Sequence, residues 1–179
     1  MAAWALAYNN PLAIIQARPD KWEGLVGSVN GKLQFDAMSN GVRAGIINLY
    51  NGYFRKGNNT LIGIFTTYAP LGHCGNSPIT YANFVSSQIG VPINQALDFE
   101  QVVVPLSLAI IRMETGTTIP ENTYLRGLYA GMDKLGFAVE GGTLKTVTVT
   151  GKKESEGKSN WWIWLLVAAA GYTIYNKRK

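Results

Sequence analysis

The C-terminal run over residues 161–176 constrains the fold most, because it is long, apolar and uncharged. Its aromatic side chains gather at the two ends: Trp161, Trp162 and Trp164 at one, Tyr172 and Tyr175 at the other. Aromatic side chains at both ends of an apolar segment are typical of the two membrane–water interfaces. The basic residues that follow can reach lipid headgroups. We therefore expect residues 161–176 to form a transmembrane anchor.

The length of this run leaves alternatives open. As a helix, residues 161–175 span roughly 22 Å, whereas the hydrocarbon core of a bilayer is about 30 Å thick. Local thinning of the bilayer can close this difference. The alternatives are a buried C-terminal helix and a helix that lies in the membrane interface.

Charge and composition exclude several other classes of protein. Apolar residues make up 47% of the chain and charged residues 15%, which excludes a disordered chain. The net charge of +5 is concentrated after residue 150, so the main body lacks the charge of a nucleic-acid-binding protein. With one cysteine and one histidine, we expect no metal site and no cofactor.

Composition also divides the chain. Residues 151–160 are polar, charged and flanked by glycine, as in a flexible linker. Before this linker, residues 143–150 are rich in Thr and Val and are expected to pair with residues 137–140 in a β-hairpin. We expect a main domain over residues 1–120 and an extension of a helix and this hairpin over residues 121–150.

Helical periodicity dominates residues 36–136, and short strands are expected between residues 22 and 35. Thr60, Ser77 and Asp98 are placed to cap three helices, and Gly57 and Gly90 to end two. The apolar stripes predict a shared set of buried side chains: Ile46, Tyr50, Ile64, Phe84, Val85, Leu106 and Ile110. The fold class is therefore mainly α, with a small β component.

Glu114 is the candidate for acid–base chemistry. It lies near the end of the helix expected from Val102 to Met113, and its neighbours at i−3 and i−4 are Ile111 and Ile110. A carboxylic acid packed against apolar side chains has a raised pKa and can hold a proton near neutral pH. Cleavage of a glycosidic bond requires such an acid. A solvated acid near a helix end is the alternative.

The order of short motifs along the chain resembles a family of phage and prophage proteins, often labelled virion structural proteins, that begin with an Asn-Asn-Pro-Gly-Asn-Ile signature. The matching residues are Asn9-Asn10-Pro11, Ile14, Trp22, Gly24, Phe35-Asp36, Gly41, Arg43-Ala44, Gly57, Thr60-Leu61, Tyr68-Ala69-Pro70, Asn76, Tyr81, Val85, Gly90-Val91, Ala109-Ile110, Glu114 and Gly116. The resemblance stops at Gly116, before the last helix and the anchor.

This family is similar to lysozyme-like peptidoglycan-cleaving domains, in which a catalytic glutamate closes a helix. The resemblance implies that Glu114 is the catalytic acid. It also implies sugar contacts from an Asn-rich turn and aromatic side chains, for which the candidates are Tyr8, Asn9, Asn10, Tyr68 and Asn76. A hydrolase would need a second carboxylate, and Glu23, Asp36 and Glu121 are the unranked candidates.

Together these features predict a membrane-anchored bacteriophage virion protein that degrades peptidoglycan locally during entry, as a lytic transglycosylase or a muramidase. Its expected partners are peptidoglycan, the lipid membrane and other virion proteins. Its expected place is an internal membrane of the virion, and the host membrane during assembly. The alternative is a non-catalytic structural protein that links the capsid to that membrane. Leu12 and Ala13, which replace Gly-Asn of the signature, favour this alternative.

Overall fold

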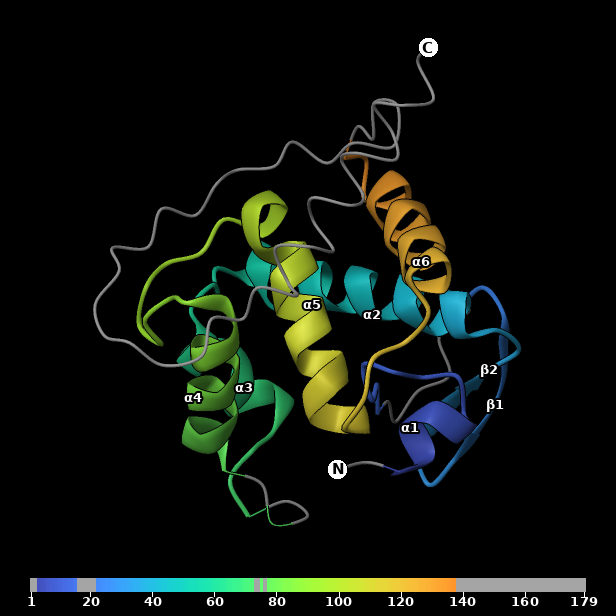
Figure 1. Cartoon of the computed structure of the whole chain (residues 1–179), viewed down its shortest axis with the longest axis horizontal. Coiled ribbons are helices and arrows are strands. Elements are labelled where there is room, and N and C mark those ends of the chain that lie inside the picture. The colour runs from blue at the N-terminus through green and yellow to red at the C-terminus, as the bar shows by residue number, and fades with distance from the viewer. Residues whose placement is uncertain (1–2, 16–21, 73–74, 76, 138–179) are drawn as a thin grey trace.

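The computed structural model describes residues 3–15, 22–72, 75 and 77–137 of the chain. These residues form helices around one long central helix, with a small antiparallel β-hairpin at one side (Figure 1). The elements are α1 (Ala3–Ala7), β1 (Leu25–Val29), β2 (Lys32–Phe35), α2 (Met38–Gly52), the 3-10 turn η1 (Phe54–Lys56), α3 (Leu61–Tyr68), α4 (Pro78–Ile89), α5 (Phe99–Thr115) and α6 (Glu121–Lys134). The predicted fold class, mainly helical with a small β component, is confirmed, and the hairpin lies where short strands were expected between residues 22 and 35.

Local side-chain chemistry sets the helix ends. The Thr60 hydroxyl accepts a hydrogen bond from the Gly63 amide at 3.1 Å, and the Asp98 carboxylate accepts one from the Gln101 amide at 3.1 Å. Ser77 caps α4 in the same way, with proline at the first helical position. At the other ends, Gly57 and Gly90 have φ of 76° and 73°, a conformation that glycine adopts without steric cost. The predicted caps are therefore confirmed.

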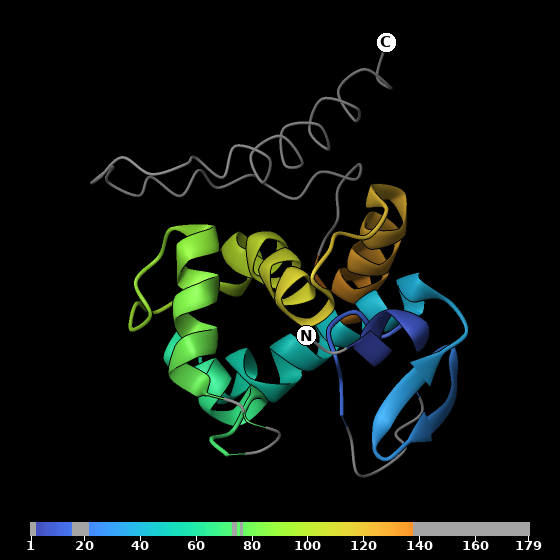
Figure 2. The same ribbon diagram turned by 60° about the horizontal axis from the view of Figure 1, so that its bottom comes forward.

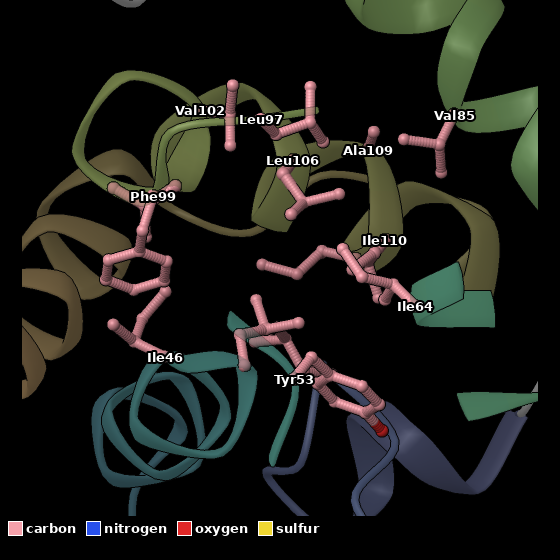
Figure 3. Close-up of a cluster of buried hydrophobic side chains, with 14 of the residues drawn as sticks. Ile46, Tyr53, Ile64, Val85, Leu97, Phe99, Val102, Leu106, Ala109 and Ile110 are labelled. Atoms are coloured by element: carbon pink, nitrogen blue, oxygen red, sulfur yellow. The ribbon is translucent and has the colours of Figure 1, made fainter. Parts of the chain in front are cut away.

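The central helix α5 carries much of the core. It lies across α2, with α3 and α4 on one side and α6 on the other (Figures 1 and 2). Its buried side chains converge with those of α2, α3 and α4 in one cluster (Figure 3). The fully enclosed members of this cluster include Ile46, Ile64, Val85, Leu106 and Ile110, as predicted.

Two of the predicted core residues are only partly buried. Tyr50 and Phe84 pack against the cluster from its edge. Tyr50 shares this edge with Phe99 and Phe137, whose ring centroids lie 5.0 Å and 5.1 Å from its own. The apolar stripe identified the correct face of each helix, but a wide aromatic side chain at the side of a stripe keeps one edge in solvent.

Helix α6 packs closely along α2. A Cβ atom added at Gly127 would overlap the Ser39 carbonyl and the Val42 side chain, and one added at Gly131 would lie 3.0 Å from the Ile46 Cβ. Tyr124, Leu128 and Met132 of α6 belong to the main cluster. The helix expected at the start of the extension over residues 121–150 is thus part of the same core as α5.

The hairpin encloses a second, smaller core. Strands β1 and β2 pair in antiparallel register, with Ser28 opposite Leu33 and Leu25 opposite Phe35. The inward side chains Leu33 and Phe35 pack with Ile14 and with Ala44 of α2. This cluster attaches the N-terminal segment to the start of α2.

Among the residues that the structure describes, no helix combines the length and the hydrophobicity needed to cross a bilayer. The predicted anchor, with Trp161, Trp162, Trp164, Tyr172 and Tyr175, lies outside the described residues, as do the linker over residues 151–160 and, apart from Phe137, the hairpin expected over residues 137–150. The membrane anchor stays a prediction.

Candidate functional site

Glu114 lies in the last turn of α5 and is the only buried charged side chain among the described residues. Only 7% of its surface is exposed. Its neighbours Ile110 and Ile111 are enclosed in the core, so the Glu114 side chain lies on the buried face of α5. Gly116, with φ of 73°, ends the helix directly after this turn. Of the two alternatives left by the sequence, the structure therefore shows an acid packed against apolar side chains and not a solvated one.

Burial controls the ionisation of this acid. Removal from water raises the pKa of Glu114 above its usual value, and a side-chain hydrogen bond with Tyr68 acts in the opposite direction. Burial has the larger effect, so the pKa is raised overall. A carboxyl group of this kind keeps its proton at a higher pH than a solvated glutamate.

Tyr68, the last residue of α3, connects Glu114 to the N-terminal segment. Its hydroxyl donates a 2.7 Å hydrogen bond to the carbonyl oxygen of Leu12. Its ring centroid lies 5.7 Å from that of Phe65 and 6.4 Å from that of Tyr53. Burial, and secondarily the charge of Glu114, raise the pKa of Tyr68 well above its usual value. The phenol therefore stays neutral at physiological pH.

Tyr53 extends this group of phenols. Burial raises the pKa of Tyr53 to about 12. It lies at the edge of the main cluster, and its hydroxyl oxygen points away from the apolar side chains (Figure 3). The phenol of Tyr68 therefore has a second neutral, poorly hydrated phenol beside it.

Asn10 uses its whole side chain to hold the N-terminal loop. Its amide nitrogen donates to the carbonyl oxygens of Ile14 and Leu33, both at 3.0 Å, and its amide oxygen accepts from the Ile14 backbone at 2.9 Å. None of its surface is exposed. Asn10 therefore fastens the loop to strand β2 and has no exposed atom for a sugar.

Asn9 and Tyr8 also contact strand β2. The Asn9 side chain donates to the Phe35 carbonyl at 2.9 Å, and the Phe35 amide donates to the Tyr8 carbonyl at 2.9 Å. The Tyr8 ring packs near that of Trp4, with centroids 5.9 Å apart. Of the predicted sugar contacts, the structure brings Tyr68 to Glu114 and sets Tyr8, Asn9 and Asn10 against the hairpin. Asn76 lies outside the described residues.

The three candidates for a second carboxylate differ in their surroundings. Glu23 forms a 2.9 Å ion pair with Arg43. Asp36 accepts a 2.8 Å hydrogen bond from the Asn40 side chain, and Glu121 is exposed in the first turn of α6. Glu23 and Asp36 are thus engaged in local contacts of the fold.

Sequence reasoning missed the glycines that seat the N-terminal loop on α2. A Cβ atom at Gly41 would overlap the Asn9 carbonyl oxygen, and one at Gly45 would lie 2.6 Å from a Leu12 methyl group. The signal was present, because two glycines four residues apart lie on one face of a helix and allow close approach. The spacing alone did not show which segment of the chain packs against these two glycines.

Within the described part of the chain, no three His, Cys, Asp or Glu side chains form a group that could hold a metal ion. Comparison with protein-family models and with curated protein sequences found no match to the chain.

Proposed function

We propose that this protein is a membrane-anchored bacteriophage virion protein that locally opens peptidoglycan, and that its helical body is a lysozyme-like domain with Glu114 as the acid. The observation that carries the proposal is a buried carboxyl group with a raised pKa at the end of a core helix. General acids of glycosidic cleavage need this environment, because they must arrive at the substrate still protonated.

The proposed chemistry begins with proton transfer. Glu114 donates its proton to the glycosidic oxygen while the bond from that oxygen to the sugar C1 carbon breaks. In a lytic transglycosylase, the 6-hydroxyl oxygen of the muramic acid then bonds to C1, and its proton passes to the Glu114 carboxylate. No water is consumed, and one carboxyl group serves both steps. This route suits an acid for which two of the three candidate partners are engaged in other contacts, Glu23 with Arg43 and Asp36 with Asn40.

The test is a comparison of the full-length wild type with Glu114→Gln on purified peptidoglycan. Glutamine has nearly the same size but no transferable proton, so activity should fall at least ~10²-fold. Release of soluble fragments measures the rate, and circular dichroism checks the fold. Mass spectrometry of the fragments separates anhydro ends, left by a transglycosylase, from the reducing ends left by a hydrolase.

Glu100→Gln is the matched control, because Glu100 is an exposed acid in the first turn of the same helix. It should retain wild-type activity. Full activity in Glu114→Gln would remove Glu114 from the reaction and return attention to Glu23, Asp36 and Glu121.

The second candidate is a non-catalytic structural protein that links the capsid to an internal membrane. It is favoured by the loop over residues 9–14, where Asn10 is consumed by backbone hydrogen bonds. Absence of wild-type activity on any peptidoglycan, with the protein still required for virion assembly, would support this candidate.

A further inference from the structure

One part of the helical body carries no charged side chain. Residues 57–97 contain no Asp, Glu, Lys or Arg, whereas about a quarter of the residues of an ordinary soluble protein are charged. This run includes the whole of α3 and α4, which pack side by side at one edge of the molecule, away from the hairpin and α6 (Figures 1 and 2). Among the described residues, all charged side chains lie on the other elements or on the segments next to them.

This uncharged part also exposes apolar side chains, at the end where α3 leads into α4. Leu71 is 81% exposed, and Ile79, in the first turn of α4, is 48% exposed. Another face of α4 is already occupied by the core, because Ala82 and Val85 are fully enclosed. We call the exposed side chains at this end the neutral surface: Thr66, Thr67, Pro70, Leu71, Ile79 and Thr80.

The polar groups of the neutral surface can be removed from water at low cost. The Thr66 hydroxyl donates a 2.7 Å hydrogen bond to the Ile62 carbonyl, and the Thr80 hydroxyl donates one of 3.0 Å to the Ser77 hydroxyl. Burial of a polar group is costly mainly when it leaves the group without a partner. These two donors keep their partners when another molecule covers them, so an apolar partner can cover the surface.

The composition of the neutral surface also limits the class of partner. Nucleic acid and anionic lipid headgroups are bound by Lys and Arg, and the run over residues 57–97 has neither. The interface of a bilayer is typically met by Trp and Tyr, and the neutral surface contains neither of these. A protein surface that also lacks charge is the remaining match, because the centre of a protein–protein interface is depleted of charged residues.

We propose that the neutral surface is a self-association site through which two copies of this chain form a symmetric dimer. A two-fold axis places a surface against its own copy. A charged surface in this position faces like charges, which repel, whereas the neutral surface has none to oppose. A different protein would have to supply a second charge-free surface, but a second copy has one by definition. Leu71 and Ile79 are the apolar anchors at the centre of this interface. The inference goes beyond the proposed function and does not depend on the chemistry of Glu114.

The experiment is sedimentation velocity of the full-length protein in a non-ionic detergent, over a series of protein concentrations. The wild type should be a dimer at micromolar concentrations. In Ile79→Lys and Leu71→Lys, the dissociation constant should rise at least ~100-fold, because each dimer then brings two like charges into one interface. Both side chains are exposed, so the fold should be retained, which circular dichroism checks. Val26→Lys is the matched control, because Val26 is an apolar side chain with 61% exposure on β1, outside the neutral surface. It should dimerise like the wild type.

A mixture of two variants tests the symmetry. Ile79→Lys and Ile79→Glu should each be monomeric alone, because each faces its own charge across the axis. Mixed in equal amounts, they should associate again, since opposite charges then meet in one interface. Absence of association in the mixture would overturn the symmetric pairing.

A wild type that stays monomeric would overturn the proposal and leave the neutral surface to a different partner. A dimer that persists in Ile79→Lys and Leu71→Lys would also overturn it, because the contact would then lie elsewhere, as in an association of the predicted anchors. Equal loss of the dimer in Val26→Lys would show that added charge acts without regard to position, and would likewise contradict the assignment.

Discussion

At the scale of single residues, Asn10 shows how a polar side chain can serve the fold and still affect the chemistry. Its amide forms hydrogen bonds with three backbone groups of Ile14 and Leu33, two residues that are almost fully buried. A buried polar group of this kind is costly to leave without a partner. By holding the loop that carries Leu12, Asn10 supports the carbonyl oxygen to which the Tyr68 hydroxyl donates.

Asn10→Asp should destabilise the protein by at least about 2 kcal/mol, because an oxygen would replace the amide nitrogen that donates to two buried carbonyls. Denaturation by urea, followed by circular dichroism, measures the loss. Asn83→Asp is the control, since Asn83 is exposed on α4, and its effect should lie within about 0.5 kcal/mol. Equal stability of the two variants would contradict the role given to Asn10.

Part of the candidate site was predictable from the sequence at this scale. The spacing of Glu114 to Ile110 and Ile111 placed it beside the apolar stripe, because helical neighbours share a face, but it left a solvated acid as the alternative. The contact between Tyr68 and Leu12 joins residues 56 positions apart. No local pattern encodes such a pair, so Tyr68 was expected to contact sugar and its hydrogen bond to the backbone was missed.

At the scale of elements, the packing of α6 on α2 depends on residues that have no side chain. Gly127 and Gly131 let the two helix backbones approach, and Tyr124, Leu128 and Met132 then fill the core on either side. Glycine weakens a helix by about 1 kcal/mol relative to alanine. Its presence twice in α6 is explained by this close contact.

Gly127→Ala should destabilise the protein by about 1–3 kcal/mol, because the new methyl group would meet the Ser39 carbonyl, which cannot turn away. Gly52→Ala is the matched control within α2. Its methyl group would lie 3.5 Å from the Asn48 amide oxygen, an ordinary contact, so helix propensity should stabilise it by up to ~1 kcal/mol. Chemical denaturation of both variants measures the difference, and a stabilised Gly127→Ala would show that the helices do not meet there.

The sequence predicted most of the helix boundaries, since caps are local. Thr60, Ser77 and Asp98 act within one turn of their own positions, and so do Gly57 and Gly90. The sequence did not predict which distant elements pack against each other. The strands between residues 22 and 35 were expected, but their packing on Ile14 and Ala44 depends on tertiary contacts.

At the scale of the whole molecule, the predicted function depends on a helical body and an anchor on one chain. The uncharged run over residues 161–176 should hold the full-length protein in lipid vesicles, because its aromatic ends match two interfaces. Val167→Arg should cost about 3 kcal/mol of insertion free energy and release much of the protein. Flotation of the vesicles with bound protein measures the partition.

Ser159→Arg is the control for this experiment, because it adds the same charge next to the polar linker and outside the apolar run. It should leave the partition unchanged. Wild-type protein that stays in the aqueous fraction would contradict the anchor.

The junction of Leu12, Tyr68 and Glu114 also bears on the order of folding. Its members come from three distant segments, and closing long loops of chain has an entropic cost that local contacts avoid. The capped helices can form from nearby residues, whereas this junction needs the loop, α3 and α5 already in place. Until then, water surrounds Glu114, and its carboxyl group ionises like any other. We therefore expect the raised pKa of Glu114 to arise late in folding, when the loop, α3 and α5 have come together and removed the carboxyl group from water.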